Sequence, residues 1–246
     1  MNTRTERLRK RLFDTDPRIC PERCIYFTES MKETEGKPNA LRRSQAFYDV
    51  LSRMTVYVNA DELIVGNQAQ WPKASPIYPE YSTDWLEAEL NGTPFFPDKR
   101  PGDKFYYTQE DKDKILECVD YWKGKSLYEN LRKTLPEKIN QAWDANVIDD
   151  TWVSAAGLGN VIVDYKGVVD KGLSDVMRRI ENKLKRLDPR EPGNTRKRWF
   201  LEAALQGNQA VVMFSGRIAD CCKEQAEQEK DETRRRELLK LEDICR

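Results

Sequence analysis

The chain has 246 residues and a mass of 28.8 kDa, which is enough for one or two domains with a sizeable core. Its 42 basic residues balance 42 acidic ones, so it lacks the net positive field that general nucleic-acid or anionic-membrane binders need. It contains no histidine, which excludes imidazole bases, Ser-His-Asp triads and histidine metal ligands. Any chemistry in this chain must therefore use carboxylates, thiols, tyrosine, lysine or arginine.

The chain start and the cysteines favour a cytoplasmic protein. No apolar run is long enough to span a bilayer, and the opening MNTRTERLRKRLF lacks the apolar core of a signal peptide. The six cysteines form no C-x-x-C pair, and without a secretory signal they are weak indicators of disulfides or of a zinc site. We expect them to be small buried hydrophobic residues.

Three helices are predicted in the first part of the chain. The first runs from Thr3 to Leu12 and gathers its apolar residues on one side. The second starts at Pro21, which suits a first helical turn, and stops at Gly36. The third follows Asn39, and its apolar residues recur at the spacing of a buried helix face.

A β-hairpin is predicted over residues 55–66. Val56 and Val58, then Leu63 and Val65, alternate with polar or smaller neighbours, as in a half-buried strand pair. The residues between the two pairs would form the bend. Three prolines then stiffen a loop that lasts to residue 80, and long ordered loops of this kind often carry function.

Helices dominate the remainder of the chain, so the predicted fold class is mainly α with a short β-hairpin. Thr108 with Asp111 resembles a capping box and predicts a helix after it. Further capping and stop signals predict helices over Ser126 to Lys133, from a cap at Thr134 to Ala145, from Asp164 toward Gly172, from a new cap at Ser174 to Leu187, from Asn194 to Gln228 and over residues 238–245. The last helical pattern reaches the final residue without a capping glycine, which favours the interpretation that the sequence is a fragment.

If the sequence is a fragment, the polypeptide that packs against its C-terminal helices is missing. The apolar stripe on the helix from Asn194 to Gln228, and the one over residues 238–245, would then be exposed. An exposed apolar patch of this size would drive self-association.

Several short motifs together resemble one family. In chain order they are Glu22-Arg23, Thr28-Glu29-Ser30, Glu35-Gly36-Lys37-Pro38, Arg42-Arg43, the run from Asp61 to Asn67, and Pro79-Glu80. They resemble the opening segment of glycyl radical enzymes, the pyruvate formate-lyase superfamily, and most of all its glycerol and diol dehydratase-like branch. The resemblance runs in order from Arg4 to Cys245, which makes it far more specific than any single motif.

The resemblance implies that residues 1–246 are the N-terminal helical portion of a barrel enzyme whose members are much longer chains. Residues 1–145 would be helical with the hairpin near 55–66, and residues 146–246 would hold a Gly-rich segment and long helices. In the family, a backbone glycyl radical in an R-V-x-G-Y or R-V-x-G-F loop abstracts hydrogen from a barrel cysteine. Arg217-Ile218 is not followed by Gly-Tyr and no cysteine matches the catalytic one, so this chain alone should not turn over.

The resemblance also indicates one substrate-binding residue, Asn160. In the dehydratase-like branch the Gly-rich segment reads G-H-x-x-x-D-Y, and its histidine reaches the substrate cavity. The matching run here is Gly159 to Tyr165, with asparagine in the place of histidine. Asn160 can donate and accept hydrogen bonds but cannot carry a proton through the reaction. Alternatively, Asn160 and Asp164 cap the helix that follows.

For the full enzyme the resemblance implies a radical lyase that is dehydratase-like or formate C-acetyltransferase-like, acting on a small polar metabolite in an anaerobic cytoplasm. Its partners would be the remainder of the barrel, a radical-SAM iron–sulfur activase that installs the glycyl radical, and a second copy in a homodimer. We expect this chain itself to bind no metal, cofactor, nucleic acid or membrane. The alternative is a non-catalytic truncated paralogue that acts as a helical binding or regulatory subunit. The substrate stays open.

Two other groups have both a functional and a structural interpretation. Asp61 and Glu62 are adjacent carboxylates suited to acid-base chemistry, but an Asp in a turn more often bonds its own backbone. Four aromatic residues near the proline-rich loop could line a ligand cleft, although we expect them to pack the loop against helices. They are Trp71, Tyr78, Tyr81 and Trp85.

Overall fold

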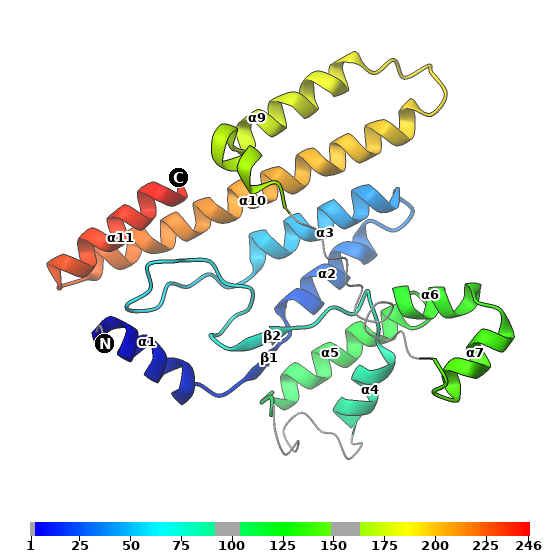
Figure 1. Ribbon diagram of the computed structural model, residues 1–246, viewed down its shortest axis with the longest axis horizontal. Coiled ribbons are helices and arrows are strands. Elements are labelled where there is room, and N and C mark those ends of the chain that lie inside the picture. The colour runs from blue at the N-terminus through cyan, green and yellow to red at the C-terminus, as the bar shows by residue number, and fades with distance from the viewer. Residues whose placement is uncertain (1–2, 92–103, 149–162) are drawn as a thin grey trace.

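The computed structural model describes residues 3–91, 104–148 and 163–246, which form a mostly helical fold with one two-stranded sheet (Figure 1). The described elements are α1 (Thr3–Asp14), β1 (Arg18–Cys20), α2 (Glu22–Glu33), α3 (Asn39–Arg53), β2 (Ala74–Pro76), α4 (Asp84–Asn91), α5 (Gln109–Trp122), α6 (Leu127–Thr134), α7 (Glu137–Asp144), α9 (Tyr165–Arg186), α10 (Asn194–Gln228) and α11 (Glu232–Cys245). None of these helices is long and apolar enough to cross a bilayer.

Helix α10 is the long central helix against which three other helices pack. It has 35 residues, so at 1.5 Å per residue it is roughly 50 Å long. Helices α3, α9 and α11 all pack against it, and α2 packs against α3 in turn (Figure 1). The prediction of one helix from Asn194 to Gln228 is confirmed, because α10 has these bounds.

The sheet is a short parallel pair. Strand β1 pairs with β2 so that Ile19 lies opposite Ser75. On the other side of β1, the Ile19 N–H donates to the Tyr106 carbonyl oxygen over 3.0 Å, which adds a third segment of chain. Residues far apart in sequence therefore meet at the start of α2.

The hairpin predicted over residues 55–66 is wrong. The structure describes this whole stretch and assigns it no strand. Its carbonyl groups accept hydrogen bonds from side chains of α10 and α11 instead of from a partner strand: Gln225 donates to Val58 over 3.0 Å, and Arg234 donates to Asn59 over 3.1 Å and to Glu62 over 2.8 Å. Because these helices supply the donors, the segment needs no β ladder.

The apolar side chains of this stretch still divide between core and solvent. Val58 is buried, and Val65 packs against the same cluster, whereas Ile64 is 93% exposed. Leu63, which the alternation also predicted to be half-buried, is 49% exposed. The alternation of residue types therefore predicted burial only in part, and it did not predict the backbone pairing.

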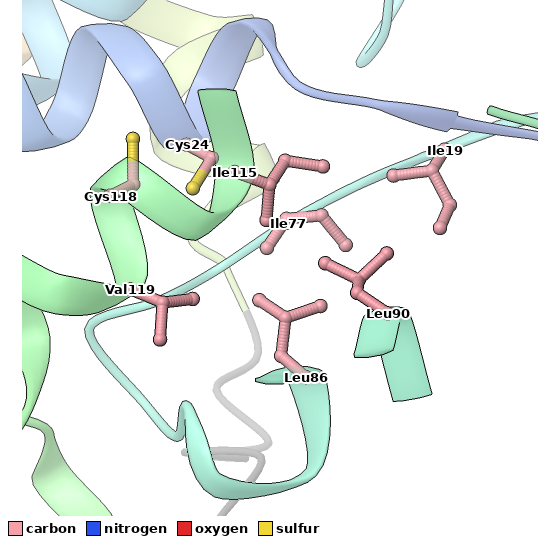
Figure 2. Packing of buried hydrophobic residues seen from close by; sticks show 8 residues of the cluster. All are labelled: Ile19, Cys24, Ile77, Leu86, Leu90, Ile115, Cys118 and Val119. Atoms are coloured by element: carbon pink, nitrogen blue, oxygen red, sulfur yellow. The ribbon is translucent and has the colours of Figure 1, made fainter. Parts of the chain in front are cut away.

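Three clusters of buried residues form the core. The first joins the strands, α2, α4 and α5 (Figure 2), the second joins α2, α3 and α5, and the third joins α10, α11 and the loop after α3. Their buried members are Ile19, Cys24, Ile77, Leu86, Leu90, Ile115, Cys118 and Val119; Phe27, Met31, Ala46, Val50, Met54 and Trp122; and Val58, Ile218, Cys222, Ala226, Leu238 and Leu241.

The prediction that both C-terminal stripes are uncovered is wrong in part. Leu238 and Leu241 are buried, because α11 turns them onto Ile218 of α10. Farther toward the start of α10, Phe200 and Val211 are 66% and 42% exposed. The large apolar side chains that α10 presents to solvent therefore lie between Phe200 and Val212, before the part of the helix that α11 covers.

Candidate functional site

Asn160, the predicted substrate-binding residue, lies outside the described residues, which resume at Val163. Immediately after it, Asp164 caps α9, because the Gly167 N–H donates to Asp164 Oδ1 over 2.9 Å. A Cβ on Gly167 would lie 2.3 Å from Asp164 Oδ2, so this cap needs glycine at residue 167. The capping interpretation is thus confirmed for Asp164, and Asn160 stays a prediction.

Asp61 and Glu62 occupy a structural turn. The Asn59 N–H donates to Glu62 Oε2 over 2.9 Å, and the Asn59 side-chain amide donates to Glu62 Oε1 over 2.8 Å. Asp61 adopts a φ of 72° and accepts hydrogen bonds from Arg7 of α1. Those bonds lower the pKa of the Asp61 carboxyl group from its usual value. Both carboxylates are therefore committed to holding the turn.

A buried ion pair joins two of the family motifs. Arg23 Nη2 lies 2.5 Å from Glu80 Oε1, and Arg23 Nη1 lies 3.0 Å from Glu80 Oε2, so the contact is bidentate. Only 2% of the Glu80 side chain is exposed. The Arg23 guanidinium also lies 3.8 Å from the ring centroid of Tyr78. Sequence reasoning missed this pair, although Glu22-Arg23 and Pro79-Glu80 both belong to the resemblance.

The pair links the start of α2 to the loop after β2. That loop in turn holds the next helices, since its Glu80 and Tyr81 carbonyl groups accept the backbone N–H groups of Leu127 and Tyr128, each over 2.9 Å. Arg23 thus positions the α6 region through one carboxylate and its neighbouring peptide groups.

The packing expected of the aromatic residues near the loop is found only in part, because Tyr78 is 41% exposed. Tyr78 and Tyr81 stack with their ring centroids 6.0 Å apart, and Arg18 lies over Trp71 at 5.3 Å. Trp85 is about half exposed. Tyr78, Tyr81 and Trp71 therefore each contact another side chain of the protein.

The two residues compared above with the family's radical loop, Arg217 and Ile218, have structural contacts. Arg217 and Ile218 lie inside α10, where Arg217 donates to the carbonyl oxygens of Leu51 and Met54 over 2.6 and 2.8 Å. Ile218 is buried in the third cluster. These contacts give Arg217 a structural role at the end of α3.

The six cysteines are free thiols, and the prediction that they are buried is confirmed for four of them, whereas Cys221 and Cys245 are half-buried. Cys24 and Cys118 face each other between α2 and α5 (Figure 2), and a hydrogen bond between them together with burial raises the pKa of the Cys24 thiol well above its ordinary value. Burial raises the pKa of Cys222 to about 11. Within the described ranges, no group of three or more Cys, Asp or Glu residues could hold a metal ion.

A shallow hollow lies between α6 and α7, but its polar groups satisfy one another. Arg132 pairs with Asp144 over 2.5 Å, and Lys133 donates to the Gly124 carbonyl oxygen over 2.6 Å. Glu129 closes a capping box with Ser126. These contacts are those of helix ends, and they leave no free group for catalysis.

The fold and these contacts define a helical shell whose polar residues hold its own segments together. A sequence model of the pyruvate formate lyase-like family matches residues 1–246. The chain therefore belongs to the pyruvate formate lyase-like family of glycyl radical enzymes.

Individual relatives agree with this assignment. An isethionate sulfite-lyase from Desulfovibrio desulfuricans is 32% identical over 97% of this chain, and a (2S)-3-sulfopropanediol dehydratase from Klebsiella oxytoca is 30% identical over 96% of it. The glycerol-bound structure of the B12-independent glycerol dehydratase from Clostridium butyricum matches all of this chain with a TM-score of 0.94 and 30% identity. The chain spans 29% of each of the two curated relatives and 31% of the glycerol dehydratase chain.

Proposed function

We propose that this chain is the N-terminal helical portion of a glycyl radical lyase or dehydratase that cleaves a C–O or related bond of a small polar metabolite. The observation that supports the proposal is the match of the whole chain, at a TM-score of 0.94, to about a third of a glycerol dehydratase. The radical glycine, the thiyl cysteine and the barrel would then belong to polypeptide outside these 246 residues. A radical-SAM activase in the cytoplasm would install the radical there.

In this proposal Asn160 contacts the substrate. The Asp164 cap fixes the start of α9, which begins five residues after Asn160 in the sequence. An asparagine side chain can donate to one substrate oxygen and accept from a hydroxyl group, which orients the substrate without proton transfer. The proton would have to move through a group of the remaining polypeptide.

A chimaera tests the proposal. Residues 1–246 replace the matched part of the Clostridium butyricum glycerol dehydratase, and the product is activated under anaerobic conditions with that enzyme's own activase. We expect a glycyl radical signal in electron paramagnetic resonance spectra. A folded chimaera that never acquires the radical contradicts the proposal.

The same chimaera tests Asn160. We expect Asn160→Ala to lower kcat/KM about tenfold or more, because one hydrogen bond to the substrate is lost. The matched control is Asn182→Ala, on an exposed part of α9, which should leave kcat/KM unchanged. Equal kcat/KM for wild type and Asn160→Ala would remove Asn160 from the site.

A further inference from the structure

The first turns of α9 carry an apolar stripe that faces solvent. Tyr165, Val168 and Val169 follow an i, i+3, i+4 spacing, so they lie on one face of the helix. Their exposed fractions are 71%, 37% and 82%. Single exposed apolar residues are ordinary, but a helix normally turns such a stripe onto a core.

Local interactions hold these turns in place without help from the stripe. Asp164 caps them, Lys166 and Asp170 form an ion pair one turn apart, and Gly167 gives the cap its room. Gly172, with a φ of 75°, then separates them from the rest of α9. The stripe is thus presented by a helix start that has its own supports.

The whole of α9 is lightly packed. Of its 22 residues, all of which the structure describes, none is buried, and its main partner is α10 (Figure 1). By contrast, α2, with 12 residues, buries five. A helix of this length that buries none of its side chains has a face available for another polypeptide.

We propose that Tyr165, Val168 and Val169, here called the α9 stripe, form the surface on which the remaining polypeptide of the glycyl radical enzyme packs. This inference rests on the proposed function. The relatives have more than three times the length of this chain, so a large body of polypeptide has to contact the shell. The stripe begins five residues after Asn160, a span of at most roughly 17 Å. If Asn160 reaches a substrate inside the barrel, the start of the stripe lies within that distance of the barrel interior.

Cysteine labelling tests the α9 stripe directly. Val169→Cys is made in the chain of 246 residues and in the glycerol dehydratase chimaera, and the rate of maleimide labelling at residue 169 is followed by peptide mass spectrometry. We expect rapid labelling in the chain alone and labelling at least about tenfold slower in the chimaera, since burial must be opened before the reagent reacts. The matched control is Phe13→Cys on α1, which is 70% exposed in the wild type and lies away from α9 (Figure 1). It should label rapidly in both proteins.

Two results would overturn the proposal. One is rapid labelling of residue 169 in a folded chimaera. The other is protection of residue 169 in the isolated chain that grows with protein concentration, because a second copy would then be the occupant. This second measurement needs no folded chimaera. A chimaera that protects residue 169 from labelling but never acquires the radical would contradict the proposed function and support the α9 stripe as an interface. The two failures are therefore distinguishable.

Discussion

At the scale of single residues, arginine side chains connect segments that are distant in the sequence through ion pairs and hydrogen bonds. Arg23, Arg217 and Arg234 each bind a carboxylate or two carbonyl groups of a distant segment. A guanidinium group suits this role because its five donors lie in a fixed plane and stay charged. A chain with few apolar residues can in this way hold long loops against helices.

The buried ion pair gives the first prediction. Replacing Arg23 with Met should destabilise the protein by roughly 3–5 kcal/mol, because the Glu80 carboxylate would be left buried without its partner. The double variant Arg23→Met/Glu80→Met should lose less than the single variant. Urea denaturation measures both.

The control for that pair is an exposed one. Asp14→Asn breaks the Lys10–Asp14 contact on the surface of α1 and should change the free energy of unfolding by less than about 0.5 kcal/mol. If Arg23→Met is as mild as Asp14→Asn, the Arg23–Glu80 pair does not anchor the loop.

Asp61 should make stability depend on pH. Its folded-state pKa is lowered by the bonds from Arg7, so its contribution is fully present above the unfolded-state value of about 4 and is lost as pH falls through the folded-state value. Asp61→Asn should therefore cost about 1 kcal/mol near pH 7. The difference in the free energy of unfolding between wild type and Asp61→Asn should decrease and disappear as the pH falls below about 4. Thermal unfolding at several pH values measures it, and a gap that widens in acid would contradict the assignment.

At the scale of elements, short local signals decide where most helices begin. Thr108 with Asp111, and Ser126 with Glu129, form capping boxes, and the first of these was predicted from the sequence alone. Thr134 was predicted to cap α7, but Pro136 occupies that position and Thr134 bonds back to Leu131. A cap competes with such bonds to the preceding turn, so its residue can be misplaced by one or two positions.

Two glycines give opposite predictions. Gly172→Ala should destabilise the chain by about 1 kcal/mol or more, because φ is 75° there. Gly207→Ala should stabilise it by about 0.5–1 kcal/mol, since Gly207 lies inside α10 and an added Cβ would meet no atom within 4 Å beyond its chain neighbours and the surrounding helix backbone. Thermal unfolding of the two variants side by side measures the difference. Two changes of the same sign would contradict the backbone argument.

At the scale of the whole molecule, α10 links the parts of the core. Phe214 packs against both the second and the third cluster, and α3 and α11 contact the same helix. A substitution that disrupts the packing of one of these clusters should therefore also destabilise the other. A shell built in this way should unfold its helices together rather than one by one.

Leu238 tests that coupling. Leu238→Ala removes a fully buried side chain of α11 and should cost about 2–5 kcal/mol. Hydrogen exchange should accelerate in α3 as well as in α11, because both depend on α10. The control is Leu239→Ala, which alters a side chain that is 44% exposed. Faster exchange confined to α11 would show that the two clusters are independent.

The sequence alone determined the helices, most of their ends and the family. These features depend on local spacing: the period of Val211, Phe214 and Ile218 marks a helix face, and Thr108 with Asp111 marks a helix start, without knowledge of any distant residue. The family followed from motifs in one order along the chain, which folding does not alter.

Only the tertiary structure decided which distant groups meet. Three contacts join residues separated by more than 50 positions. They are the parallel pairing of Ile19 with Ser75, the Arg23–Glu80 ion pair, and the hydrogen bond that Arg234 donates to the Asn59 carbonyl oxygen in place of a partner strand. The predicted hairpin was wrong for this reason. A period of two describes the order of residue types along the chain, but the partner of a backbone carbonyl group is the donor that the fold brings beside it.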